Sequence, residues 1–381
     1  MSNIIAEYAG TEQDRMAQIA ATGVRVLSLD GGGVKGLSSA HIIAALEARL
    51  DETPLYRYFD LVAGTSTGSI IASSLVYQHM SGAELVVFYR RLCAELFDVS
   101  WTSKLTSLLR TGGEYSSAVV DATAQAYFGA TLMREVAWPK CAVTATEAID
   151  DRTTPGLFTS YDAAQSSKRS YARDDVAVRD AVRSSSALPF GFEAVQIGSR
   201  FYVDGGIWAN NPARVALDDA LNLFVPGGQN GAVDADLAHL GMLLSIGCGK
   251  SPARPSDGKL ASHGPKSTAL RMFNAIADPE PVHRALLDGG LGDGINYRRL
   301  NAIYTERVGA TSYDQVAQIE RDTLQWIDEN AVLLDQVAEK LKRGGERARN
   351  RVVVPTSPVD ELANQFVPIE HTPAGHLLVA E

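Results

Sequence analysis

The sequence has 381 residues, a formal net charge of −10, 45% apolar residues and 21% charged residues, which are the proportions of a globular protein with a substantial core. The acidic balance argues against a protein that binds a nucleic acid polymer by general electrostatics, because such proteins carry an excess of basic residues. Three scattered cysteines, Cys93, Cys141 and Cys248, fit neither a disulfide framework nor a metal site and are expected to be small core residues.

The N-terminal segment has early acidic residues and no unbroken apolar stretch, so it does not resemble a secretory signal. No stretch of the chain reaches the roughly 18 apolar residues that a membrane-spanning helix needs. We therefore expect a cytoplasmic protein.

The first elements alternate between strand and helix. The first twenty residues predict a polar helical leader, residues 24–30 a buried strand, and residues 36–50 an amphipathic helix. A second buried strand is expected at 59–64 and a second helix at 66–80. This alternation predicts a mainly parallel sheet with both faces covered.

Later segments extend the same pattern. Further strands are expected at 140–146, 200–206 and 239–247, and further helices at 175–189 and 212–224. From Tyr313 to Arg343, apolar residues spaced three and four apart predict a helix packed on the sheet.

Residues 98–113 bring apolar and basic side chains together at helical spacing. These residues suit a helix that lies at a membrane interface or acts as a lid, but core packing is the commoner role of such a stripe, and both interpretations stay open. The side chains concerned are Trp101, Lys104, Leu105, Leu108, Leu109 and Arg110.

The first strand ends in the sequence LDGGGVKG. A glycine-rich turn between a strand and a helix typically holds an anion on its backbone N–H groups. A dinucleotide is disfavoured, because the second strand does not end in an acidic residue and Asp30 would lie near the pyrophosphate. The alternative is an oxyanion hole formed by the N–H groups of Gly31, Gly32 and Gly33.

The second strand runs into GTSTG, residues 64–68, directly before a helix. A GxSxG sequence on a strand-to-helix turn indicates a nucleophilic serine, here Ser66, with small neighbours Gly64 and Gly68 that permit close packing. The helix N-terminus at this serine favours developing negative charge.

A serine hydroxyl needs a base within hydrogen-bond reach. Asp204 closes an apolar strand and precedes Gly205 and Gly206. Alone it would be a turn residue. Together with the glycine loop and the GTSTG turn, however, the aspartate is predicted to be the base, at the same carboxyl edge of the sheet as Ser66.

Together, DGGGVKG, GTSTG and VDGG followed by NNP resemble the patatin-like phospholipase family, and SSSALPFGFEAV at 184–195 resembles that family's segment before the aspartate. The resemblance covers about residues 24–250 and extends toward 305. It implies a three-layer α/β/α sandwich and hydrolysis of phospholipid acyl esters without a metal or other cofactor.

Carried over residue by residue, the resemblance makes Ser66 the nucleophile, Asp204 the base of a dyad and glycines 31–33 the oxyanion donors. It makes Gly36, Gly64, Gly68, Gly205 and Gly206 supporting residues. Lys35 is either a contact for a lipid headgroup or a solvated lysine. A lipase of this kind would act at the phospholipid membrane surface as a peripheral protein.

The expected organisation is a leader at 1–22, a catalytic domain at 23–305 with its core motifs in 24–250, a helical segment at 306–343 packed on the core, and an extension at 344–381. The oligomeric state stays undetermined by the sequence.

Two other functions stay open. An α/β-hydrolase with a Ser-Asp-His triad is possible in chain order, because His239, His263 and His283 follow Asp204. The other function is that of a sensor without hydrolytic activity, in which the glycine loop holds a nucleotide. In addition, some bacterial patatin-like enzymes are antiphage effectors switched on by cyclic nucleotides, so a small nucleotide activator is a further hypothesis.

Overall fold

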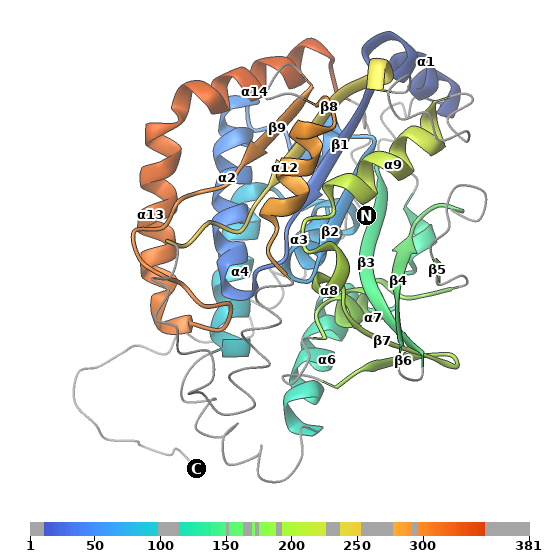
Figure 1. The fold of residues 1–381 in the computed structure, drawn as a ribbon, viewed down its shortest axis with the longest axis vertical. Coiled ribbons are helices and arrows are strands. Elements are labelled where there is room, and N and C mark those ends of the chain that lie inside the picture. The colour runs from blue at the N-terminus through green and yellow to red at the C-terminus, as the bar shows by residue number, and fades with distance from the viewer. Residues whose placement is uncertain are drawn as a thin grey trace, which may run out of the picture.

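A mixed sheet of nine described strands forms the centre of the protein (Figure 1). The computed structural model describes residues 11–97, 114–136, 138–149, 152–162, 170–171, 175–187, 193–225, 237–252, 277–291 and 296–346. The main path of the sheet runs in the order β5-β4-β3-β2-β1-β8-β9, and β7 pairs with both β3 and β6. The strands are β1 (Val24–Leu29), β2 (Leu61–Thr65), β3 (Lys140–Ile149), β4 (Arg152–Thr159), β5 (Ser170–Tyr171), β6 (Val195–Ile197), β7 (Arg200–Asp204), β8 (Leu240–Ile246) and β9 (Tyr297–Leu300).

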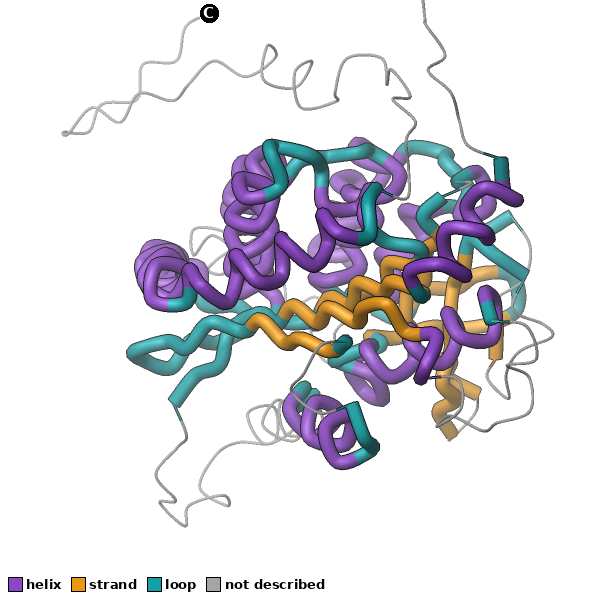
Figure 2. Tube along the Cα trace, turned by 90° about the horizontal axis from the view of Figure 1, so that it is seen from above, coloured by secondary structure: helices purple, strands orange, loops and turns teal. Residues whose placement is uncertain are grey.

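Helices cover both faces of this sheet, so the strands lie between two helical layers (Figure 2). The α-helices are α1 (Glu12–Thr22), α2 (Gly36–Arg49), α3 (Thr67–Tyr77), α4 (Gly82–Phe97), α6 (Glu114–Phe128), α7 (Val178–Ser185), α8 (Gly206–Ala209), α9 (Ala213–Phe224), α12 (Glu280–Asp288), α13 (Val316–Glu329) and α14 (Ala331–Arg343). Short 3-10 helices are η1 (Gly33–Lys35), η2 (Leu55–Tyr58), η3 (Met133–Glu135), η5 (Leu237–His239) and η7 (Tyr313–Gln315). The expected three-layer α/β fold is confirmed.

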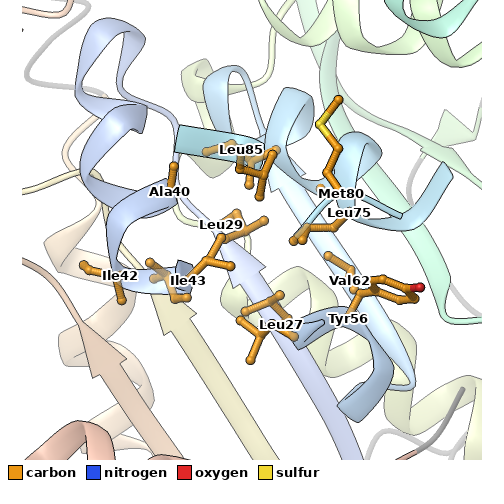
Figure 3. Packing of buried hydrophobic residues seen from close by; sticks show 14 of the residues in the cluster. Leu27, Leu29, Ala40, Ile42, Ile43, Tyr56, Val62, Leu75, Met80 and Leu85 are labelled. Atoms are coloured by element: carbon orange, nitrogen blue, oxygen red, sulfur yellow. The ribbon is translucent and has the colours of Figure 1, made fainter. Parts of the chain in front are cut away.

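Each central strand contributes to two hydrophobic cores, because successive side chains of a strand point to opposite faces. On β1, Val26 packs in the core that includes α9 and α12, whereas Leu27 and Leu29 pack in the core that includes α2, α3 and α4. Figure 3 shows Leu27 and Leu29 beside Ile43 of α2 and Val62 of β2. Burial on both faces explains why the strand reads as a nearly continuous apolar run.

The parallel pairing of β1, β2 and β8 brings their carboxyl ends together. Leu29 at the end of β1 lies opposite Gly64 in β2 and opposite Ile246 in β8. The turns that follow β1 and β2 therefore lie side by side, as the sequence predicts for the glycine loop and the GTSTG turn.

Strand β7 differs from the expected arrangement, because it runs antiparallel to β3. Strand β2 pairs with the first half of β3, up to Thr65 opposite Thr144. Strand β7 continues along the same strand, with Asp204 opposite Ala145. The ends of β2 and β7 therefore meet beside neighbouring residues of β3, and this meeting, rather than a shared carboxyl edge of parallel strands, brings Asp204 to the turn after β2.

The C-terminal helical region also differs from its prediction. The pattern from Tyr313 to Arg343 forms two helices, α13 and α14, with Asn330 between them, and both pack on α2. The side chain of Arg25 on β1 donates to the carbonyl of Leu341 at 3.1 Å and to that of Gly345 at 2.9 Å, which satisfies carbonyls at the end of α14.

Other expectations are settled by burial or lie outside the described residues. Cys93, Cys141 and Cys248 are free and buried, which confirms them as core residues. The stripe at 98–113 lies outside the described residues, and so does His263. Within the part of the chain that the structure describes, no helix is long and apolar enough to span a bilayer.

Candidate active site

Ser66 lies between the end of β2 and the start of α3 with a strained backbone. Its φ of 51° and ψ of −122° fall in a region that residues with a side chain rarely adopt. The side chain is partly exposed, whereas Thr65 and Thr67 on either side are buried. The turn therefore presents the serine hydroxyl to its surroundings, as expected for a nucleophile on a sharp strand-to-helix turn.

The glycines of the GTSTG turn allow this close packing. A Cβ atom added at Gly64 would lie 2.2 Å from the carbonyl oxygen of Gly68, and one at Gly68 would lie 2.2 Å from the carbonyl oxygen of Leu29. Neither position accepts a larger residue without movement of the backbone. The close contacts at Gly64 and Gly68 therefore leave no room for a side chain.

Asp204 at the end of β7 meets Ser66. The Ser66 side chain lies close enough to the Asp204 carboxyl group to lower its pKa. The Gly206 N–H donates to Asp204 Oδ1 at 2.7 Å, and a Cβ atom at Gly205 would lie 2.3 Å from Thr144 Oγ1. The turn after Asp204 therefore orients its carboxyl group and fits closely against β3.

The environment of Asp204 favours a base that works near neutral pH. The side chain is buried, with 2% of the residue exposed. Burial raises the pKa of the Asp204 carboxyl to about 7, and the hydrogen bonds from the Gly206 N–H and the Ser66 side chain oppose this rise. A carboxyl group with such a pKa can accept and return a proton close to neutral pH.

The glycine loop after β1 lies against the serine turn. A Cβ atom added at Gly31 would lie 3.2 Å from the Cβ atom of Ser66. The carbonyl oxygen of Gly33 accepts hydrogen bonds from Thr67 Oγ1 at 3.0 Å and from the Tyr89 hydroxyl at 2.8 Å. A Cβ atom added at Gly36 would lie 2.0 Å from Thr67 Cγ2, so the supporting role expected for Gly36 has a steric basis.

The three glycines of the loop differ in the hydrogen bonds of their N–H groups. The Gly31 N–H donates to the carbonyl oxygen of Asn210 at 3.0 Å, so it is already engaged. Within the described parts of the chain, the N–H groups of Gly32 and Gly33 donate to no carbonyl or side chain. These two groups are therefore the loop donors that remain available for an oxyanion.

Lys35 lies in η1, next to the glycines, and is partly exposed. Its Cε atom would lie 3.5 Å from a Cβ atom added at Gly32. Burial lowers the pKa of Lys35, the nearby Cys248 and Asp30 oppose this change, and Arg307 lowers the pKa further. The lysine thus places a positive charge beside the glycine loop and differs from a fully solvated side chain.

A buried charge network behind the loop was not predicted from the sequence. Arg299 on β9 donates to Asp30 Oδ2 at 2.7 Å and to Glu280 Oε1 at 3.0 Å. Burial raises the pKa of Asp30 to about 6, and the charge of Arg299 opposes the rise. The aspartate that precedes the glycines is therefore anchored to the last strand of the main sheet path.

Asn210 is a second residue that the sequence reasoning did not assign. Besides accepting from Gly31 through its carbonyl oxygen, its side-chain Nδ2 donates to the Gly31 carbonyl at 3.3 Å and to the Ala277 carbonyl at 2.5 Å. Its place in the NNP sequence after VDGG was the available signal. Asn210 thus connects the turn after Asp204 to the glycine loop.

The histidines considered for a triad do not join Ser66 and Asp204 in the described parts of the chain. His283 shares a hydrogen bond of 2.8 Å between its Nδ1 and the Tyr297 hydroxyl. His239 lies in η5, before the start of β8, and is exposed. Among the described residues, no group of three or more His, Cys, Asp or Glu side chains is arranged to hold a metal ion.

Comparisons with known proteins indicate the family to which the chain belongs. A family model described as "Patatin-like phospholipase" matches residues 27–217. Calcium-independent phospholipase A2-gamma of Oryctolagus cuniculus is 26% identical over 330 residues, which cover 84% of this chain and 40% of that protein. Patatin-like protein 2 of Arabidopsis thaliana is 30% identical over 262 residues, which cover 60% of this chain and 61% of that protein.

A search of solved structures gave a distant similarity to VipD from Legionella pneumophila, with a TM-score of 0.36 and 13% identity, covering 81% of this chain and 67% of the other. The chain spans about 40% of the length of the phospholipase A2-gamma relative and about 61% of the Arabidopsis relative.

Proposed function

Because this chain belongs to the patatin-like phospholipase family, we propose that it hydrolyses carboxylic esters of membrane phospholipids through a Ser66–Asp204 dyad. The reaction passes through an acyl-enzyme and releases a free fatty acid. The observation that carries the proposal is the place of the buried, oriented Asp204 carboxyl group beside Ser66, at a strained turn next to a glycine loop.

In the first half of the reaction, Asp204 accepts the proton of the Ser66 hydroxyl as the serine oxygen attacks the ester carbonyl carbon. The tetrahedral intermediate collapses, the bond to the lysolipid oxygen breaks, and Asp204 returns the proton to that oxygen. A pKa of about 7 supports both steps, because the carboxyl group is then neither too weak a base nor too weak an acid.

In the second half, water attacks the acyl-enzyme carbonyl and Asp204 accepts a proton from that water. The Ser66 oxygen leaves and takes the proton back, so the free fatty acid departs and the dyad returns to its starting state. One carboxyl group therefore acts as base and acid in turn.

The oxyanion that forms in both halves requires hydrogen-bond donors. We assign this role to the N–H groups of Gly32 and Gly33, because the Gly31 N–H is engaged by Asn210. Loss of one such donor in other enzymes reduces the rate by roughly 100- to 1000-fold. Gly31, which was also expected to donate, instead serves as the anchor of the loop.

Lys35 is proposed to contact the anionic phosphate of a phospholipid substrate. Lys35 is a partly exposed residue beside the glycine loop, and Arg307 adds a second positive charge in its surroundings. The substrate would be reached from the cytoplasmic face of a membrane, with the protein bound peripherally.

The experiment that tests the hydrolase uses phospholipid vesicles and mass spectrometry of the products, with the full chain and its Ser66→Ala variant. The wild-type protein should release fatty acid and lysolipid, with or without EDTA, and Ser66→Ala should release neither. A fluorophosphonate should label the wild type and not Ser66→Ala. Absence of both hydrolysis and labelling in the wild type, with and without added cyclic oligonucleotides, would refute the proposal.

The same assay separates the other functions. A Ser-Asp-His triad requires that one of His239→Ala, His263→Ala and His283→Ala abolish hydrolysis, whereas a dyad tolerates all three changes. Hydrolysis that appears only with a cyclic oligonucleotide would identify a switched enzyme of the kind known from antiphage defence. Binding of such a nucleotide without any hydrolysis would identify a sensor.

A further inference from the structure

The C-terminal end of α7 contacts both members of the dyad. The Ser66 N–H donates to Ser185 Oγ at 2.7 Å. On the other side, the Gly205 N–H donates to the Ser185 carbonyl at 3.3 Å, and the Asp204 N–H donates to the Ala187 carbonyl at 3.0 Å. Two residues of one short segment, Ser185 and Ala187, therefore join two turns that are far apart in the sequence.

The hydrogen bond from the Ser66 N–H is made at a residue with an unfavourable backbone conformation. Ser66 has a positive φ, and a residue with a side chain persists in such a conformation only where surrounding contacts hold it. Ser185 is fully buried, so water does not readily replace its hydroxyl as the acceptor. Removal of the Ser185 hydroxyl would leave the Ser66 N–H without its acceptor.

Helix α7 is itself well anchored, so its end is a fixed reference for the dyad. At its start, the Val178 N–H donates to the Thr131 carbonyl at 2.8 Å. Near its end, the buried Arg183 donates through Nε to Asp121 of α6 at 2.8 Å. The helix also packs on β3 and β7. A hydroxyl at the end of this helix therefore has a defined position relative to the sheet.

The neighbours of Ser185 provide an internal comparison, because all three consecutive serines are described. Ser184 Oγ donates within the helix to the Asp180 carbonyl at 2.7 Å. The hydroxyl of Ser186 is buried and has no hydrogen-bond partner among the described residues. Of these three hydroxyl groups, the one on Ser185 is the one that contacts the serine turn.

We propose that Ser185 is a positioning residue for the hydrolysis, in which its hydroxyl holds the backbone of Ser66 while the carbonyls of Ser185 and Ala187 hold the turn at Asp204. The end of α7 thus sets the separation between the nucleophile and its base. This role rests on the proposed hydrolase function, since it acts through the dyad and does not contact the substrate.

The test compares Ser185→Ala with Ser184→Ala and Ser186→Ala in the full chain. For each variant, kcat and KM are measured on a short-chain ester, together with the rate of fluorophosphonate labelling and the melting temperature. Because Ser185 aligns the reacting groups, Ser185→Ala should lower kcat and the labelling rate by roughly 10- to 100-fold and change KM by less than about twofold. The two control variants should keep kcat within about twofold of the wild type.

A second variant covers the case in which Ser185→Ala does not fold. Ser185→Cys fills nearly the same space with a weak acceptor, so it should keep the melting temperature near that of the wild type and still lower kcat. The proposal is overturned if a folded Ser185 variant has the kcat and labelling rate of Ser184→Ala, or if KM changes instead of kcat. A wild type without hydrolysis or labelling would instead refute the hydrolase itself, and this role with it.

Discussion

Thr65 and Thr144 share a hydrogen bond of 2.7 Å between their side-chain oxygens at the point where β2 ends beside β3. Thr65 Oγ1 also donates to the carbonyl of Ala209 at 2.6 Å, in the helix that follows Asp204. On β3, the next residue after Thr144 lies opposite Asp204. The two threonines therefore join the serine turn and the aspartate turn at the meeting point of three strands.

The first prediction concerns the pH dependence of hydrolysis. Asp204 acts as a base only when it is deprotonated, and burial raises its pKa to about 7. The value of kcat/KM should therefore rise with pH and level off above about 7, with a roughly tenfold change per pH unit on the acid side. A profile measured from pH 3 to 9 that is flat, or that falls only near the ordinary aspartate pKa of 3.8, would remove Asp204 from the role of base.

The second prediction concerns stability. The folded state raises the pKa of Asp204 from 3.8 to about 7, so it binds the proton more tightly than the unfolded state does. Stability is therefore lost as pH rises between these two values, and above them the charged group destabilises the folded protein. Asp204→Asn should raise the free energy of unfolding at pH 8 by roughly 2 to 4 kcal/mol.

At pH 5 the same substitution should raise the free energy of unfolding by less, because the folded wild type is then mostly protonated. Urea unfolding at the two pH values measures both effects. A gain that is equal at pH 5 and pH 8, or a loss at pH 8, would contradict the raised pKa.

The third prediction compares two glycines that have the same φ of +61°. A Cβ atom at Gly33 would lie 2.0 Å from the carbonyl oxygen of Ala310, whereas one at Gly198 would meet nothing within 4 Å. Gly33→Ala should displace the loop and lower kcat by at least about 100-fold. Gly198→Ala carries the same backbone strain and should cost about 1 kcal/mol of stability with kcat unchanged. Equal kcat values for the two variants would exclude Gly33 from the oxyanion loop.

The fourth prediction concerns the two asparagines of the NNP sequence. Asn210→Ala removes the side-chain donor to the Gly31 and Ala277 carbonyls and should lower kcat by roughly tenfold, because the glycine loop loses an anchor.

The matched control is Asn211→Ala. Asn211 Oδ1 accepts from the Ala213 N–H at 3.0 Å, at the start of α9. Its loss should lower the free energy of unfolding by about 1 kcal/mol and leave kcat near the wild-type value. Thermal unfolding and steady-state kinetics of both variants measure this difference, and a larger fall in kcat for Asn211→Ala would reverse the assignment.

The sequence was most informative where one local motif specifies its own geometry. The strand–glycine–helix turns at 24–36 and 61–68 were predicted correctly, because buried strands, glycines and amphipathic helices each leave a local pattern. The sequence predicts that Ser66 and Asp204 lie close together, but it does not predict the strand pairing that brings them together. An antiparallel β7 that follows on from β2 is a long-range pairing, which no local pattern encodes.

Positioning residues were harder to find for a related reason. Arg299 in β9 looks like a surface residue in the sequence, and it is buried because Asp30 and Glu280 neutralise its charge. Ser185 belongs to a run of three serines, and the sequence alone does not show which of their hydroxyl groups contacts the serine turn. The apolar repeat from 313 to 343 likewise does not reveal the break at Asn330. The buried residues of α13 and α14 keep the same spacing of three and four residues on both sides of Asn330.

The most direct test of the Ser66–Asp204 dyad is the rate of fatty acid release from phospholipid vesicles by Asp204→Asn, measured beside Ser66→Ala and the wild type at pH 8. If Asp204 is the base, Asp204→Asn should be folded, at least as stable as the wild type, and as inactive as Ser66→Ala, a loss of at least about 1000-fold. Near-normal release of fatty acid by Asp204→Asn would contradict the dyad.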